Sequence, residues 1–376
     1  MQKDSLVFVT TGLGSGGAEQ VLYNIIKKAN KDHRILVISI IGDGYFKDKI
    51  KELGVEVLLL NFNKNFFFKL GFFITIFRLI KAIFKIRNST SPIIYGWMPH
   101  GAIMSYCLNL FCKNTTLIYA MRDSLDINYE PKKLIIGLMK YLAQKAHVIT
   151  FNSKNGQEQY NAVGISNKNE RFIPNGYNKD NFIITNKENF KKEIFNKFNL
   201  NKNQVLIGFL ARAHPMKGLD ILIKSANIIL QNNPNIVFLI CGNNNFSSYK
   251  KFISPNHYNN FIFTGFIEDT RKIISSFDIL VSSSKYGEGF SNSIAEAMMM
   301  EVICVATDVG DSAYILGNTG QLVNPNSVRD LTSGIESILK LKGAQRKEMQ
   351  KNCRKRIIEN FPEEKMIDQF LELKNI

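Results

Sequence analysis

Short hydrophobic runs alternate with segments of helical spacing along most of the chain. The first run, residues 6–10, is followed by a glycine-rich stretch and then by apolar residues at positions 21, 22, 25 and 26, which share one face of a helix. Further runs cover residues 35–41 and 55–60, with helical residues between them. Buried strands that alternate with helices in this way predict a parallel sheet covered by helices.

The alternation is interrupted by a polar segment, rich in Lys and Asn, at residues 177–203. Apolar runs that we expect to be strands precede and follow it, at residues 93–95, 117–123, 147–153, 172–176, 205–210, 237–242, 262–266 and 279–282. A chain of 376 residues is long enough for two domains with separate cores. We therefore predict an α/β protein with one Rossmann-like domain at 1–177, a second at 178–360 and an amphipathic terminal helix at 361–376.

The segment 66–85 is rich in Phe and Ile and approaches the length of a membrane span. A span needs about 20 apolar residues with few charges, and Lys69, Arg78 and Lys81 interrupt this one. Arg78, Lys81 and Lys85 are three and four positions apart, so they share one helical stripe. This pattern predicts an amphipathic helix on a membrane surface. The alternative is a helix packed on the sheet with a solvated basic edge.

The formal net charge of +16 is concentrated in the first half of the chain. Residues 1–178 carry 23 Lys and Arg against 12 Asp and Glu, and residues 179–376 carry 25 against 20. A basic half favours an acidic partner, which is either nucleic acid or an anionic membrane. The five cysteines have no C-x-x-C spacing, and residues 6–10 are too short for the core of a signal peptide. We therefore expect free thiols and a cytoplasmic protein.

Two carboxylates, Glu288 and Glu296, stand eight positions apart in the segment that carries the clearest chemical pattern. Gly287 and Gly289 flank the first and favour a tight turn. Good helix formers follow, which predicts a helix start at residues 291–293. The unpaired amides of a helix start attract phosphate, and carboxylates accept hydrogen bonds from sugar hydroxyls. The segment therefore predicts a site for a sugar joined to a phosphate.

A structural alternative is that Ser293 and Glu296 form a capping box. The pattern Glu-Gly-Phe-Ser-Asn-x-x-x-Glu, however, resembles the E-x(7)-E signature of the retaining group 1 glycosyltransferases, which have the GT-B fold. In that family the first Glu faces the donor sugar, the second binds the nucleotide ribose, and the amides between them hold phosphate and sugar. The resemblance implies these roles for Glu288 and Glu296, and for the intervening donor-binding residues Gly289, Phe290, Ser291 and Asn292. It departs at Glu301 and Ile303, where many members have Gly and Pro.

Other segments resemble the same family. The glycine loop at Gly16 and Gly17 follows an expected strand and precedes a helix, which suits anion binding, although a plain tight turn is the alternative. Arg212 and Lys217 lie in a loop between strand and helix, and they resemble the pair that binds the donor diphosphate. The turn at Gly265 resembles the loop that reads the base.

His100 follows the expected strand at 93–95, at the end of the sheet where ligands collect in open α/β folds. Its segment resembles the one that brings a catalytic His toward the reacting sugar, and a buried structural His is the alternative. Arg122 and Asp123 end the run at 117–123. They either contact an acceptor phosphate or pair with each other.

From the resemblance we expect a GT-B fold, with two Rossmann-like domains facing across a cleft and the terminal helix crossing back to the first. We expect transfer of a sugar from a nucleotide-sugar donor, UDP-linked, to a lipid-linked saccharide or another glycan acceptor, with retention, in surface polysaccharide or glycoconjugate biosynthesis. The sequence has no D-x-D triplet, so we expect neither metal nor cofactor. Residues 66–87 would hold the enzyme peripherally on the inner membrane face.

Two alternatives belong to other classes of protein. A nucleotide-sugar 2-epimerase also has two Rossmann-like domains, but the carboxylate pair and the basic pair favour transfer. A nucleic-acid-binding protein would explain the net charge of +16. The chain lacks the recognisable basic and aromatic motifs of that class.

Overall fold

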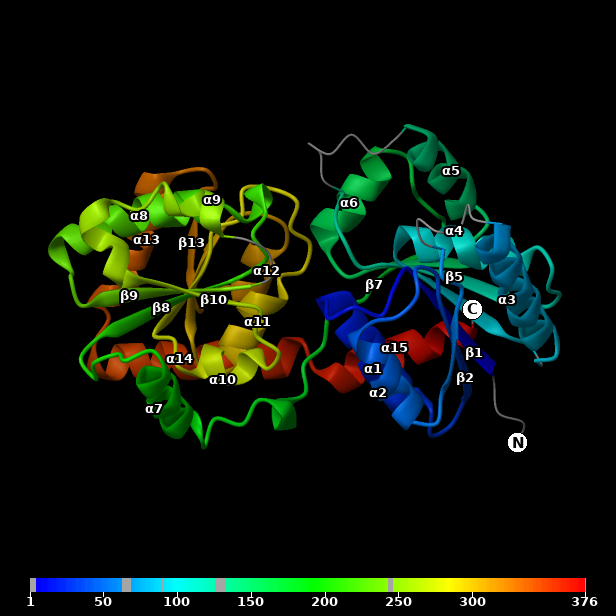
Figure 1. The fold of residues 1–376 in the computed structure, drawn as a ribbon, viewed down its shortest axis with the longest axis horizontal. Coiled ribbons are helices and arrows are strands. Elements are labelled where there is room, and N and C mark those ends of the chain that lie inside the picture. Colours follow the sequence, from blue (N-terminus) through cyan, green and yellow to red (C-terminus); the bar gives the residue numbers. More distant parts are fainter. Residues whose placement is uncertain (1–4, 63–68, 90, 126–132, 243–245, 376) are drawn as a thin grey trace. The chain divides into compact units, whose positions relative to one another are not determined.

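The computed structural model describes residues 5–62, 69–89, 91–125, 133–242 and 246–375. The chain divides into two compact units (Figure 1). Unit 1 comprises Met1–Gly176 together with Glu364–Ile376, and unit 2 comprises Tyr177–Glu363. The end of the chain therefore belongs to the same unit as its beginning.

Within the described residues, unit 1 is built on a seven-stranded parallel sheet with the order β3-β2-β1-β4-β5-β6-β7. The strands are β1 Ser5–Thr10, β2 Arg34–Ser39, β3 Glu56–Leu59, β4 Ile93–Trp97, β5 Thr116–Met121, β6 Val148–Phe151 and β7 Glu170–Phe172. In β1, Leu6 and Phe8 enter one core while Val7 and Val9 enter the other. Helices cover both faces of the sheet, which explains why the strands are continuous apolar runs.

One face of this sheet is covered by α1 Gly17–Ala29, α2 Tyr45–Glu52 and the C-terminal helix α15 Glu363–Glu372. The other face is covered by α3 Lys69–Arg87, α4 Met98–Asn109, α5 Lys133–Ala143 and α6 Lys154–Ala162. Met366 and Phe370 of α15 are buried in the first core, and the Tyr95 hydroxyl donates a hydrogen bond to the carbonyl oxygen of Phe370 at 2.9 Å. The prediction that the terminal helix returns to the first domain is confirmed.

Unit 2, in the part of the chain described, carries a six-stranded parallel sheet with the order β10-β9-β8-β11-β12-β13. Its strands are β8 Val205–Leu210, β9 Ile236–Cys241, β10 Phe261–Gly265, β11 Ile279–Ser282, β12 Ile303–Thr307 and β13 Gln321–Val323. Its helices are α7 Lys187–Lys197, α8 Leu219–Asn232, α9 Ser247–Lys250, α10 Thr270–Ser275, α11 Asn292–Met299, α12 Ser312–Leu316, α13 Val328–Lys340 and α14 Gly343–Asn360. The strand order reverses between β8 and β11, which is where open α/β sheets bind ligands.

The segment 177–203 is more structured than its polar composition indicated. It contains α7, whose Phe195 is buried in the core of unit 2, and Lys191 of this helix forms a 2.8 Å ion pair with Asp278. Unit 2 begins at Tyr177, so α7 is part of a folded unit rather than of an extended linker.

The apolar segment expected at 66–85 is helical over the part described, as α3. Residues 66–68 lie outside the described residues. Across the described residues, no helix combines the length and the apolar character that crossing a membrane requires.

Candidate active site

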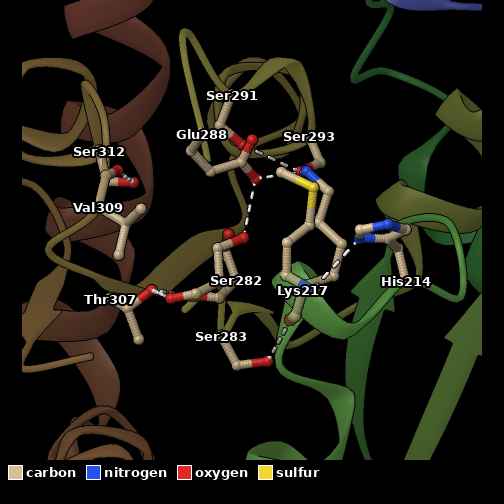
Figure 2. A network of polar contacts seen from close by, with 12 residues as sticks. His214, Lys217, Ser282, Ser283, Glu288, Ser291, Ser293, Thr307, Val309 and Ser312 are labelled. Carbon is tan, nitrogen blue, oxygen red and sulfur yellow. Dashed lines mark hydrogen bonds and ion pairs between the residues drawn. The ribbon is translucent and has the colours of Figure 1, made fainter. Parts of the chain in front are cut away.

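Lys217 and Glu288 form a shielded ion pair in unit 2 (Figure 2). Their Nζ and Oε1 atoms are 2.6 Å apart, and the side chains are 17% and 10% exposed. Lys217 ends the short 3-10 helix Pro215–Lys217 that follows β8, and Glu288 follows β11. The two charges therefore meet where the strand order of this sheet reverses.

The loop that carries Lys217 has no room for a larger residue at Gly218. This glycine has φ of +63°, and a Cβ atom there would lie 1.9 Å from the carbonyl oxygen of Ser283. The Ser283 hydroxyl donates hydrogen bonds to the carbonyl oxygens of Lys217 and Gly218, at 3.1 and 3.0 Å. The backbone on both sides of Lys217 is thus fixed against the end of β11.

The turn that carries Glu288 is fixed in a similar way. Gly287 has φ of +69°, in the left-handed region that glycine tolerates. The Glu288 carboxylate accepts hydrogen bonds from Lys217 and from the Ser284 hydroxyl, the second at 2.9 Å. The backbone amide of Asp311 donates to the carbonyl oxygen of Gly289 at 3.1 Å, which ties this turn to the loop after β12.

Helix α11 begins at Asn292, directly after this turn, with Ser291 as its N-cap. Ser291 makes no side-chain capping bond. Amides at the start of a helix are suited to binding an anion. Glu296 accepts a hydrogen bond from the Thr270 hydroxyl at 3.2 Å. Because the helix begins before Ser293 and Glu296 contacts Thr270, the capping-box alternative is wrong.

Burial raises the pKa of the Glu296 carboxyl to about 7, although the hydrogen bond from Thr270 acts in the opposite direction. The carboxyl is therefore partly protonated near neutral pH and can both donate and accept hydrogen bonds.

The far end of α11 explains the departure of Glu301 from the family pattern. Glu301 has φ of +55°, a conformation that glycine adopts more easily. The Lys187 ammonium donates to the carbonyl oxygens of Met300 and Glu301 at 2.8 and 3.0 Å, and Arg354 donates to that of Met299. Two cations at a helix C-terminus interact favourably with its dipole, and they hold the turn without glycine.

The remaining donor-site candidates of unit 2 also follow strands of the same sheet. Arg212 is exposed in the loop between β8 and Lys217, and Gly265 ends β10 with φ of +73°. Phe290 is buried against Phe361, with ring centroids 5.3 Å apart, so only its backbone is available to a ligand. The structure brings Lys217, Glu288 and the start of α11 together and leaves the Arg212 side chain in solvent.

In unit 1, Gly16 is the N-cap of α1, Gly17 is its first residue, and His100 lies exposed in the first turn of α4. These helices follow the neighbouring strands β1 and β4. The Trp97 indole donates to the carbonyl oxygen of Ala18 at 3.1 Å, which joins the end of β4 to the start of α1. The glycine loop and His100 therefore lie at the same edge of the sheet.

Asp123 follows β5, the next strand of that sheet. Its carboxylate accepts a 2.8 Å hydrogen bond from the Tyr160 hydroxyl. Burial raises the pKa of Asp123, while the Tyr160 hydrogen bond and the charge of His100 oppose this shift. His100 and Asp123 therefore follow two neighbouring strands, β4 and β5, of the same sheet.

Arg122 is buried, and its side chain is held by contacts within unit 1. Its guanidinium donates to the carbonyl oxygen of Ile173 at 3.0 Å and to the Asn175 side chain. It also lies 5.4 Å from the ring centroid of Trp97 and 5.3 Å from that of Phe370. These contacts connect the end of β5 to residues 173–175, just before the chain enters unit 2, and to Phe370 of the C-terminal helix α15.

Several partners in the site could not be identified from the sequence. The Tyr160 hydroxyl bonds Asp123 across 37 positions, and the Tyr177 hydroxyl bonds Asn292 across 115 positions. No local pattern marks either tyrosine. Among the described residues, no group of three or more His, Cys, Asp or Glu side chains is arranged to hold a metal ion.

Residues 190–356 match the family model for glycosyl transferases group 1. A similar curated protein is poly(ribitol-phosphate) alpha-N-acetylglucosaminyltransferase of Staphylococcus aureus, 26% identical over 256 residues, which cover 62% of this chain and 51% of that protein. Another is UDP-Gal:alpha-D-GlcNAc-diphosphoundecaprenol alpha-1,3-galactosyltransferase of Escherichia coli, 26% identical over 214 residues, which cover 54% and 52%. The chain thus spans about half the length of the curated relatives it matches.

Solved structures resemble the chain over almost its whole length. HepE of Anabaena, in complex with UDP and glucose, has a TM-score of 0.84 at 20% identity and covers 99% of each chain. WaaG, a glycosyltransferase involved in lipopolysaccharide biosynthesis, has a TM-score of 0.74 at 12% identity and covers 98% of this chain and 99% of its own. These similarities and the two parallel sheets confirm the predicted GT-B fold. The family match lies in unit 2, so that residues 190–356 of the chain are similar to the group 1 glycosyltransferases.

Proposed function

We propose that the protein transfers a sugar from a UDP-sugar to a lipid-linked saccharide or another glycan acceptor, in surface polysaccharide or glycoconjugate biosynthesis. The observation that carries this proposal is the shielded Lys217–Glu288 pair beside the start of α11. The UDP and glucose bound in the HepE structure support the donor. The diphosphoundecaprenol in the name of the Escherichia coli relative supports a lipid-linked acceptor.

On the donor side, three groups oppose the charge of the departing diphosphate. Lys217 contributes its ammonium, Arg212 its exposed guanidinium, and α11 the amides of its first turn. Such preorganised charges stabilise the negative charge that develops as the bond to the sugar breaks. This assignment makes the reaction independent of a metal ion.

The two carboxylates act at different parts of the donor. Glu296, with its pKa raised to about 7, holds the ribose hydroxyls. Glu288 faces the donor sugar, and its ion pair with Lys217 links the sugar position to the diphosphate position. Gly265 serves the base through its main chain, and the glycine loop at Gly16 and Gly17 is assigned to donor binding as well.

On the acceptor side, His100 is the catalytic residue of unit 1 and Asp123 contacts the acceptor. The bond between the anomeric carbon and the diphosphate oxygen breaks, and the acceptor hydroxyl oxygen bonds to that carbon on the same face. The hydroxyl proton passes to the departing UDP, and the configuration is retained. Arg122 acts indirectly, because its guanidinium is occupied by the backbone near Ile173 and by two aromatic rings.

An acceptor in a membrane requires the enzyme to reach the bilayer surface, and α3 supplies a suitable face. Phe77 and Phe84 of this helix are 69% and 64% exposed, and Phe73 and Ile80 complete the same outward stripe. Ala82 and Ile86 on the opposite side of the helix are buried in the core. The helix is therefore apolar both toward the sheet and toward solvent, which a purely structural helix does not require.

Basic groups line this outward stripe. Arg34, Lys81 and Lys85 form a groove with Phe77 and Phe84, and Lys85 also pairs with Glu56 at 2.6 Å. Attraction between a basic side chain and an anionic lipid surface contributes about 1 kcal/mol each. Helices α4 and α5 cover the same face of the sheet as α3, and further exposed apolar residues lie in α5 and just after α4. They are Leu110, Phe111, Ile135, Leu138 and Tyr141. Together they support peripheral binding to an anionic inner membrane face, with the enzyme in the cytoplasm.

The transfer itself is tested by incubating the purified protein with a panel of UDP-sugars and a membrane lipid extract. Release of UDP with sugar attached to lipid is the expected result. Conversion of one UDP-sugar into another, with no labelled lipid, would instead identify an epimerase.

The membrane contact is tested by vesicle flotation of the double variant Phe77→Ser/Phe84→Ser and of Lys81→Glu. Both are expected to release the protein from anionic vesicles without changing UDP affinity, because the altered side chains are exposed. Ile228→Ser, an exposed apolar position on α8 of unit 2, is the matched control. Equal flotation of wild type with neutral and anionic vesicles, or with neither, would refute the surface.

A further inference from the structure

The chain passes between the two units twice, at Gly176–Tyr177 and at Glu363–Glu364. These two crossings are hydrogen-bonded to each other. The Tyr177 amide donates to the carbonyl oxygen of Phe361 at 2.8 Å, and the Glu363 amide donates to the carbonyl oxygen of Tyr177 at 3.2 Å. Tyr177 and Pro362 thus form a parallel bridge outside the two sheets. We call residues 176–177 and 361–364 the double crossing.

The side chain of Tyr177 extends from the double crossing to the donor site. Its hydroxyl donates a 2.6 Å hydrogen bond to the Asn292 side chain, at the first residue of α11. Its ring stacks on Phe290 with an interplanar angle of 26° and a centroid distance of 6.4 Å. Phe361, in the other crossing strand, packs edge-on against Phe290 at 5.3 Å. Both parts of the double crossing, through Tyr177 and Phe361, therefore contact Phe290, which lies two residues after Glu288.

We infer that Tyr177 is a positioning residue that couples occupancy of the donor site to the double crossing. The inference rests on the proposed donor role of the start of α11. A diphosphate bound to the first amides of α11 acts on Asn292, which is bonded to the Tyr177 hydroxyl. The peptide groups of Tyr177 carry both backbone bonds of the double crossing, so a shift of the helix start is transmitted there.

The geometry leaves little freedom for this movement to be absorbed. Tyr177 is buried, and its ring lies between Phe290 and Phe182, the latter edge-on at 6.2 Å. Close-packed side chains transmit small displacements because no void accommodates them. If Tyr177 had a purely structural role, its replacement would only lower the stability of the protein. Coupling predicts in addition that UDP binding changes the amide exchange of the double crossing.

The first test compares UDP affinity, measured by calorimetry, in Tyr177→Phe and Tyr95→Phe. Both variants lose one tyrosine hydroxyl that donates a hydrogen bond, and Tyr95 belongs to unit 1, whereas α11 belongs to unit 2. We expect Tyr177→Phe to bind UDP about fivefold more weakly, which is the effect of losing one neutral hydrogen bond. Tyr95→Phe should lower the melting temperature comparably and leave UDP affinity unchanged.

A double-mutant cycle shows whether the effect passes through Asn292. The double variant Tyr177→Phe/Asn292→Ala should bind UDP no more weakly than Asn292→Ala alone, because Asn292→Ala already removes the hydrogen bond between the two side chains. Additive losses would overturn the inference. So would unchanged UDP affinity in Tyr177→Phe when the wild type binds UDP normally.

Hydrogen exchange of the full-length protein gives a readout that a structural role would not change. UDP should slow exchange of the Tyr177 and Glu363 amides in the wild type, and this protection should disappear in Tyr177→Phe. Peptides from β4 serve as the internal reference. No UDP-dependent change at the double crossing would refute the coupling alone, whereas no UDP binding by the wild type would refute the proposed donor and the inference with it.

Discussion

Replacing Lys217 by Ala removes one half of the shielded pair with Glu288. The two side chains are 2.6 Å apart, and both are mostly withdrawn from solvent, so the bond is poorly screened. A charge-assisted hydrogen bond contributes about 1.5–3 kcal/mol, and the bond from Lys217 to a donor phosphate belongs to the same class. Loss of that bond corresponds to a factor of about 10 to 150. We therefore expect Lys217→Ala to weaken UDP binding or donor turnover at least tenfold.

The chain offers a matched control for this variant. Lys285 pairs with Asp220 at 2.8 Å, and the two side chains are 21% and 17% exposed. Lys285→Ala thus removes an ion pair of similar length and exposure from the same unit. Calorimetric titration with UDP and initial-rate kinetics are measured for both variants, together with their melting temperatures. Equal UDP affinity in the two variants, with equal loss of stability, would refute the assignment of Lys217 to the diphosphate.

Four further predictions concern the carboxylates and the metal. Glu296→Gln should chiefly raise the donor KM, because a ribose contact exists before the reaction, and unchanged donor kinetics would contradict the contact. Since burial raises the Glu296 pKa from 4.5 to about 7, the folded protein binds more protons than the unfolded chain between these values. The free energy of unfolding should therefore fall as pH rises from about 4.5 to about 7 in the wild type and fall less in Glu296→Gln, as denaturant titrations can measure. Glu288→Gln should chiefly lower kcat, and a change confined to KM would argue against its contact with the reacting sugar. Activity should persist in EDTA, and a complete loss that magnesium or manganese restores would contradict the metal-free assignment.

The features that the sequence revealed are those determined by neighbouring residues. The turn at Gly287 and the start of α11 at Asn292 depend on glycine conformation and helix propensity within a short segment, and both occur where they were expected. Strands β8 and β11 have the predicted bounds because each is a continuous apolar run between polar loops.

The features that the sequence did not reveal depend on contacts with distant residues or on weak sequence patterns. Glu296 has the spacing of a capping box, and only the folded chain places Thr270 beside it. In α7, the polar majority obscures the apolar spacing of Phe190, Ile194 and Phe195. Strand β13, Gln321–Val323, is too short for period-two alternation to be recognised. Tertiary contacts decide each of these cases.

The double crossing also changes how the chain can be divided. Unit 2 enters and leaves at residues that are bonded side by side, so in covalent terms it is an insertion between the last strand of unit 1 and its terminal helix. Insertions whose ends meet can be removed or exchanged with little strain on the host. A short turn joining Gly176 to Glu364 would keep Met366 and Phe370 in the core beside β4. The same architecture would allow unit 2 to be exchanged for another folded unit while the sheet and the terminal helix of unit 1 stay the same.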